Sequence, residues 1–105
     1  MAVIDGMDLS IARLEWSTSA PGASPAARLE GQFNLTLWGT FTGLDARLQR
    51  SFDAGATWHA CTRAGAQVAL TAPVSEIWEE PEAGMLYRVN VIAIVSGTVN
   101  ARLSR

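Results

Sequence analysis

The side chains best suited to acid–base or metal chemistry are four glutamates in one short stretch, Glu76, Glu79, Glu80 and Glu82. Two carboxylates held about 5–10 Å apart can hydrolyse a glycosidic bond, and six to eight oxygen ligands in an ordered loop can hold calcium. The spacing in this stretch matches no calcium-binding loop, and four acids on one exposed turn are usually solvated. We therefore expect neither catalysis nor a bound metal there.

The only histidine and the only cysteine of the chain lie close together, at His59 and Cys61. A lone cysteine has no disulfide partner in its own chain, and zinc sites usually take several ligands from cysteine and histidine. No nucleophile signature surrounds Ser51, so the serines lack the histidine partner that would activate them. The sequence thus predicts a protein that is not an enzyme and that binds no cofactor and no metal.

The most informative pattern is SFDAGATW, residues 51–58, because S-x-D-x-G-x-T-W matches the Asp-box of sialidase-type β-propellers. In such a loop the aspartate accepts hydrogen bonds from the loop's own amides, and the glycine takes the positive φ of a tight reversal. The tryptophan is an apolar anchor for the returning strand. One copy does not make a propeller, which needs about four blades. We expect a structural turn formed by Ser51, Asp53, Gly55, Thr57 and Trp58.

Composition indicates one small domain with apolar surface left for a partner. Of 105 residues, 49% are hydrophobic and only 17% are charged, against about 25% in typical soluble domains. All eight basic residues are scattered arginines and the net charge is −2, so no nucleic-acid contact is expected. The first residues carry no basic cluster, and no apolar run approaches the roughly 18 residues of a membrane span. We expect a protein made in the cytoplasm, without membrane contact.

Alternating apolar side chains predict short β-strands over most of the chain. Phe33, Leu35 and Leu37 alternate with polar residues, and the same period of two recurs in later segments up to residue 104. Turn signals about every 8–12 residues separate these segments, which is typical of an antiparallel sandwich or barrel. We predict an all-β fold, a compact antiparallel β-sandwich of jelly-roll or immunoglobulin-like type.

The domain boundary is expected near residue 28. The segment STSAPGASPAA, residues 17–27, is small, polar and contains two prolines, which favours a flexible connector. Residues 1–28 are therefore predicted to form an extended N-terminal arm and linker. Residues 29–105 are predicted to form the β-sandwich domain.

Three segments together resemble a group of small β-sandwich proteins of tailed bacteriophages: GQFNLTLWGTF, LQRSFDAGATW and EEPEAGMLYRVNVIAIVSGTVNARLS. The shared order is a G-x-F-N strand ending in G-T-F, the R-S-F-D-x-G-x-T-W hairpin, an E-P-x-x-G-x-L-Y-R strand, and S-G-T before a last strand ending in R-L-S. The resemblance covers residues 29–105. It implies a virion structural role, of the head decoration or cement type, on the head surface after assembly in the bacterial cytoplasm.

The implied partner is the major capsid protein, bound by a homo-oligomer in which a trimer is favoured, because some proteins of this group bind capsid lattices as trimers. Residue type and strand phase suggest which side chains make the contacts. The expected contacts of the arm are Val3, Ile4, Met7, Leu9, Ile11 and Trp16. The expected contacts at subunit interfaces are Trp38, Arg47, Trp78 and Arg88.

Three alternatives remain at this stage. The chain fits a tail or vertex accessory protein, since the sequence does not place it on the particle. It also fits a carbohydrate-binding module on the particle surface, for which exposed tryptophans such as Trp38 and Trp78 would be the sugar contacts. A sialidase-like hydrolase is disfavoured, because the arginine cluster, the tyrosine nucleophile and the repeated Asp-boxes are missing.

Overall fold

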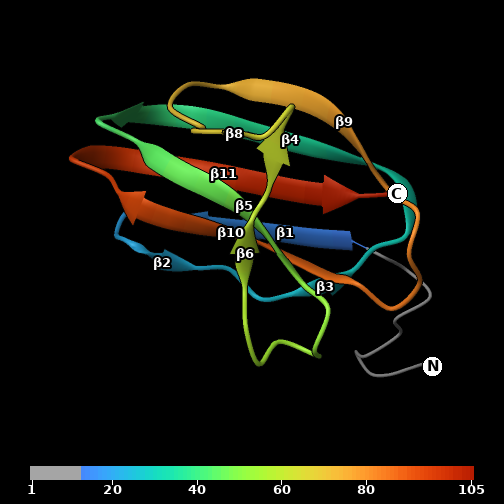
Figure 1. Ribbon diagram of the computed structural model, residues 1–105. Helices are drawn as coiled ribbons and strands as arrows, with labels where there is room; N and C mark the ends of the chain where they lie inside the picture. The colour runs from blue at the N-terminus through green and yellow to red at the C-terminus, as the bar shows by residue number, and fades with distance from the viewer. Residues whose placement is uncertain (1–12) are drawn as a thin grey trace.

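The computed structural model describes residues 13–105, and these residues form an all-β fold of antiparallel sheets (Figure 1). Two sheets account for most of the strands, and a two-stranded ribbon lies beside them. The predicted all-β, antiparallel and compact character is confirmed. The predicted arm contacts Val3, Ile4, Met7, Leu9 and Ile11 lie outside the described residues.

Four strands, among them the longest of the described chain, form the first sheet, called sheet 1. Its long strand pairs over nine residues with the C-terminal strand, from Asn34 opposite Ser104 to Thr42 opposite Ser96. Alternation explains the fold, because from Phe33 to Leu37 every second side chain of the long strand is buried while its neighbours face outward. In spatial order the strands are β1 (Arg13–Thr18), β11 (Ser96–Ser104), β4 (Gly31–Thr42) and β9 (Val74–Glu80).

The second sheet, sheet 2, is built around one strand with partners on both sides. In spatial order its strands are β2 (Gly22–Ala23), β10 (Leu86–Ala93), β5 (Asp45–Ser51) and β6 (His59–Ala60). A further short strand, β3 (Ala27–Arg28), also pairs with β10. The separate ribbon consists of β7 (Thr62–Arg63) and β8 (Ala66–Gln67).

Inward-facing side chains of both sheets form one hydrophobic core. An aromatic contact joins the two sheets near its centre: the rings of Phe33 on β4 and Tyr87 on β10 lie 4.7 Å apart between centroids, tilted by 56°. Both residues are almost completely buried. The other large side chains that are fully buried include Leu29, Leu35, Leu37, Val89, Val91, Val99 and Leu103.

Part of the expected N-terminal arm is integrated in the sheets, so the boundary at residue 28 requires correction. Strand β1 pairs with β11 from Arg13 opposite Ser104 to Thr18 opposite Val99, and β2 and β3 pair with β10. Leu14 is buried, and Trp16 packs against the core. Residues 13–28 thus complete both sheets, because the edges of β11 and β10 offer backbone partners that the composition of the segment does not reveal.

Two short connections pass between the sheets at one end of the molecule, one from β4 to β5 and one from β10 to β11. They lie against each other (Figure 1). The Val95 amide donates to the Thr42 carbonyl at 2.9 Å, and a β-carbon on Gly43 would lie only 2.3 Å from Val95 Cγ2. Val95 is nevertheless 79% exposed, and Ile92 is 48% exposed. This crossover end, formed by residues 41–43 and 92–96, therefore presents apolar side chains on a hydrogen-bonded backbone.

Candidate functional site

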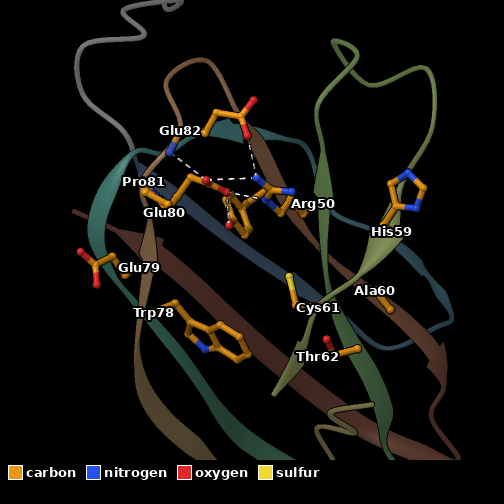
Figure 2. A pocket seen from close by; sticks show the side chains of 11 residues that line it. Arg50, His59, Ala60, Cys61, Thr62, Trp78, Glu79, Glu80, Pro81 and Glu82 are labelled. Atoms are coloured by element: carbon orange, nitrogen blue, oxygen red, sulfur yellow. Dashed lines mark hydrogen bonds and ion pairs between the residues drawn. The ribbon is translucent and has the colours of Figure 1, made fainter. Parts of the chain in front are cut away.

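A cleft opens between β9 of sheet 1 and the β5–β6 pair of sheet 2, with a volume of about 410 Å³ (Figure 2). Polar groups lie at one end of the cleft, where Arg50 reaches toward Glu80, the last residue of β9, and toward Glu82 just after the strand. An apolar wall of Cys61 and Trp78 continues the opening beyond them. The lining residues are Arg50, His59, Ala60, Cys61, Thr62, Trp78, Glu79, Glu80, Pro81, Glu82 and Tyr87.

The polar end of the cleft is a fully bonded ion pair. Arg50 donates through Nε to Glu80 Oε1 at 2.5 Å and through Nη2 to Glu80 Oε2 at 3.1 Å. The Tyr87 hydroxyl donates to Oε1 at 2.7 Å, and the Glu82 amide donates to Oε2 at 2.9 Å. The Glu80 side chain is only 1% exposed, whereas that of Arg50 is 33% exposed. Two-point binding of this kind is the strong geometry for arginine and carboxylate.

Neither Glu80 nor Tyr87 has a pKa near 7, because hydrogen bonding lowers the pKa of Glu80 and burial raises the pKa of Tyr87. The hydrogen bond from Arg50 is the largest cause that lowers the pKa of Glu80, from 4.5 to about 2, against the opposing effect of burial. Burial, followed by the neighbouring Glu80 carboxylate, raises the pKa of Tyr87 well above its usual value. A general acid or base works best with a pKa near the working pH. This cluster therefore holds the two sheets together and exchanges no proton near pH 7.

The histidine and the cysteine of the cleft differ in their environments, since Cys61 is partly buried and His59 is exposed. Burial raises the pKa of the Cys61 thiol to about 11, so at neutral pH the thiol stays protonated and is a poor nucleophile. His59 is exposed and stacks on Phe52, with ring centroids 5.1 Å apart and the planes within 5°. Between residues 13 and 105, no three histidine, cysteine or acidic side chains are grouped so as to hold a metal ion.

The loop at residues 51–58 is closed by hydrogen bonds among its own residues. The Asp53 carboxylate accepts from the Thr57 amide at 2.9 Å and from the Thr57 hydroxyl at 2.5 Å. Ser51 Oγ donates to Asp53 Oδ1 at 2.8 Å and accepts from the Gly55 amide at 2.9 Å. The bonds that the Asp53 carboxylate accepts, with that of the Thr57 hydroxyl first, lower the pKa of Asp53 to about 2. Both Ala54 and Gly55 have positive φ.

Replacing Ser51 by alanine is expected to lower the free energy of unfolding by about 1–2 kcal/mol, because the half-buried Gly55 amide and the Asp53 carboxylate lose a partner. Ser51 is completely buried. The matched control is Ser75→Ala, since Ser75 is exposed and bonds only the Thr36 hydroxyl, at 3.2 Å. Urea titration of both variants measures the difference; equal losses would mean that the loop bonds add no stability beyond a surface hydroxyl pair.

Two tryptophans expected at the loop or at interfaces are covered by arginines. The guanidinium carbon of Arg88 lies 4.2 Å from the ring centroid of Trp58, and Arg88 Nε also donates to Gln49 Oε1 at 2.8 Å. Arg63 lies 4.2 Å from the Trp78 ring centroid. Stacking of this kind stabilises both partners. Trp58 and Trp78 are thus half-buried, with their exposed faces reduced by these cations.

The remaining candidates are dispersed over the two sheets. Trp38 faces outward on sheet 1 and is 45% exposed. Arg47 lies on the outer face of sheet 2, where it forms an ion pair with Asp45. Trp16 packs against the core from β1. The structure thus brings Trp78 to the cleft, places Trp16 and Trp38 around one hollow on sheet 1, and leaves Arg47 apart from both.

The Arg50–Glu80–Tyr87 cluster was missed by the sequence analysis, which treated the four glutamates as one solvated turn. The phase of β9 puts Glu80 on the inward side with Val74, Glu76 and Trp78, but this phase alone does not distinguish Glu80 from Glu76. Of the other glutamates, Glu76 lies 3.7 Å from Arg63, and Glu79 is exposed. The glutamates therefore do not act as a group.

Comparisons with models of known protein families, with curated proteins and with solved structures find no match for this chain. Among the described residues, no helix of the length and apolar character needed to cross a membrane occurs.

Proposed function

We propose that this chain is a structural protein of a tailed-bacteriophage particle, a head decoration protein that binds the assembled capsid lattice and stabilises it. The proposal starts from the resemblance of residues 29–105 to small phage virion proteins. In this proposal the two sheets form a β-sandwich of jelly-roll or immunoglobulin-like type, and the chain acts by binding without catalysing a reaction. The protein is located on the head surface, and its partner is the major capsid protein.

The observation that supports this function most directly is the exposure of apolar side chains at the crossover end. Val95 and Ile92 are exposed by 79% and 48%, yet the backbone beneath them is held by the bond from the Val95 amide to the Thr42 carbonyl. The Thr42 and Ser96 hydroxyls, 2.6 Å apart, also join the two connections. An apolar surface that is ordered before binding loses little conformational entropy when a partner covers it. The crossover end thus has the properties of a contact surface.

Binding at this end would stabilise a head through mass action and symmetry. A protein that binds only the assembled lattice shifts the equilibrium toward that lattice. If three copies act as one homotrimer, each modest contact is multiplied, because the second and third contacts form within one complex. A tail or vertex location is the alternative, and it would use the same surface at far fewer positions on the particle.

Replacing Val95 by aspartate is expected to weaken binding to heads of the encoding phage at least about tenfold, since the contact would bury an unpaired charge. Co-sedimentation of the full chain with heads that lack it measures the affinity. Ile77→Asp is the matched control, because Ile77 is also exposed, by 65%, but lies on β9 away from the crossover end. Both variants should keep the wild-type thermal midpoint within a few degrees. Equal binding by Val95→Asp and wild type would contradict the proposed contact surface.

A further inference from the structure

The outer face of sheet 1 contains a shallow hollow of about 580 Å³ that the crossover end does not include. Trp38 rises on one side of the hollow, and strand β1 bounds the opposite side. The hollow is open to solvent from above the sheet. Its lining residues are Glu15, Trp16, Ser17, Trp38, Asn100 and Ala101.

The strand register explains the position and the width of this hollow. Trp38 on β4 is paired with Asn100 on β11, and Asn100 is paired in turn with Ser17 on β1. Neighbouring strands lie about 4.8 Å apart, so the two outer members of this row are separated by about 10 Å. The short Asn100 side chain between them forms the floor. A space of this width admits one six-membered sugar ring lying against the indole.

The groups around the hollow suit a ligand that is rich in hydroxyls. The exposed indole face of Trp38 offers an apolar surface to the C–H face of a sugar ring. Asn100 Nδ2 donates to the Trp38 carbonyl at 3.3 Å, and no group of residues 13–105 donates to the Asn100 amide oxygen, which can accept from a ligand. Hydroxyls of Ser17 and, further along the face, of Ser19 and Thr98 add both donors and acceptors.

The charges at the hollow favour a neutral ligand. The acid of the hollow, Glu15, is paired with Arg102, whose Nε donates to Glu15 Oε2 at 3.0 Å. The two charges offset each other, while the second carboxylate oxygen and the remaining guanidinium N–H groups stay available for hydroxyls. Among the residues that line the hollow Glu15 is the charged one, so an anionic glycan would meet no cation in the lining, while Arg13 is exposed farther along the same face.

The outer face of sheet 1 lacks the contiguous apolar centre of a typical protein interface. Within residues 13–105 its large exposed apolar side chains are Trp38 and Ile77, and they do not form a continuous patch, because Ile77 is paired with Asn34, four residues along β4 from Trp38. That offset corresponds to about 13 Å along the strand. Interfaces between proteins usually bury a contiguous apolar centre. A sugar ring needs only one aromatic surface with polar groups beside it.

We propose that this hollow binds one neutral pyranose unit of a glycan, with the ring stacked on Trp38 and its hydroxyls bonded to Asn100, Ser17 and the Glu15–Arg102 pair. The site does not depend on the proposed binding to capsids, because it lies on a different surface. It would let a particle-bound protein hold neutral polysaccharide at the same time.

The test is a titration of the full isotope-labelled chain with four neutral probes, cellopentaose, mannopentaose, xylopentaose and chitopentaose, followed by amide NMR shifts. At least one probe is expected to bind with a Kd of about 1 mM or tighter and to shift the amides near Ser17, Trp38 and Asn100. Trp38→Ala should raise that Kd at least tenfold. Ile77→Ala is the matched control, since it removes the other exposed apolar side chain of this face and should leave the Kd unchanged.

The amide spectrum of each variant reports whether the fold is retained, and Asn100→Ala gives a second variant within the hollow. Absence of shifts with all four probes at 10 mM, or shifts that lie elsewhere and survive Trp38→Ala, would overturn the proposal. Sedimentation velocity of wild type and Trp38→Ala tests the other possible occupant of this face, a second copy of the chain. If Trp38→Ala dissociates an oligomer while no probe binds, the face belongs to a second copy of this chain and the glycan site is wrong.

Discussion

Replacing Glu80 by glutamine is expected to lower the free energy of unfolding at pH 7 by about 3 kcal/mol. The carboxylate is 1% exposed and accepts bonds from Arg50, from the Tyr87 hydroxyl and from the Glu82 amide. An amide in its place presents N–H groups to these donors, which leaves buried polar atoms without partners. Urea or thermal unfolding measures the loss. The matched control is Glu79→Gln, because Glu79 is exposed on the same strand, and its change should stay below about 0.5 kcal/mol.

The same substitution should also flatten the dependence of stability on pH. The folded pKa of Glu80, about 2, lies below its ordinary value of 4.5. The stability that this shift supplies is therefore complete above about pH 5 and is lost as the pH falls toward 2. The difference between wild type and Glu80→Gln should shrink across that window. Asp53 titrates in the same window in both proteins, so the comparison isolates Glu80. A constant difference from pH 7 to pH 2 would contradict the account of the ion pair.

Replacing Gly97 by alanine is expected to lower the free energy of unfolding by about 4 kcal/mol, or to prevent folding at 37 °C. Gly97 has a φ of +90°, and a β-carbon would lie 2.1 Å from the Thr40 carbonyl oxygen and 2.7 Å from Phe41 Cα. Both obstacles are backbone atoms of the paired strand, so β4 and β11 would have to separate. The soluble yield and the thermal midpoint of the variant measure the effect.

Gly65→Ala is the control that separates this overlap from the strain of a positive φ. Gly65 has a φ of +80°, close to that of Gly97, but a β-carbon there meets nothing within 4 Å. Its cost should therefore be only the backbone strain, about 1–2 kcal/mol. If the two substitutions cost the same, close strand approach at Gly97 is not what requires glycine.

The all-β antiparallel fold could be predicted because its longest strands carry a local signal. In β4 the inward side chains are Phe33, Leu35 and Leu37, and every one of them is buried as the period of two requires. The last strand behaves in the same way, with Val99, Ala101 and Leu103 in the core. Local alternation decides which face is buried, so these elements are visible in the sequence alone.

Residues 13–28 could not be placed from the sequence because their structure depends on distant partners. Strand β1 exists through its pairing with β11, which lies more than eighty residues later in the chain, from Arg13 opposite Ser104 onward. The two-residue strands β2 and β3 depend in the same way on β10. Small residues and prolines within the segment favour loops locally, and backbone pairing overrides that preference.

The Arg50–Glu80–Tyr87 cluster and the hollow beside Trp38 could not be predicted from the sequence for a related reason. The role of Glu80 depends on Arg50 and Tyr87, which come from two other strands, so no spacing within the acidic stretch marks it. The hollow beside Trp38 likewise requires the order of β1, β11 and β4, which only the tertiary structure defines. The outward phase of Trp38 was predictable from alternation along β4, whereas the polar neighbours across the strands were not.

The proposed role as a lattice-binding decoration protein is tested most directly by the copy number of the chain in purified particles. Quantitative mass spectrometry against the major capsid protein gives this number without any assumption about the contact surface. The proposal predicts a ratio near one chain per capsid subunit, or a simple fraction of it. A handful of copies per particle would contradict lattice binding and place the chain at a tail or vertex, and absence from the particle would contradict a virion role altogether.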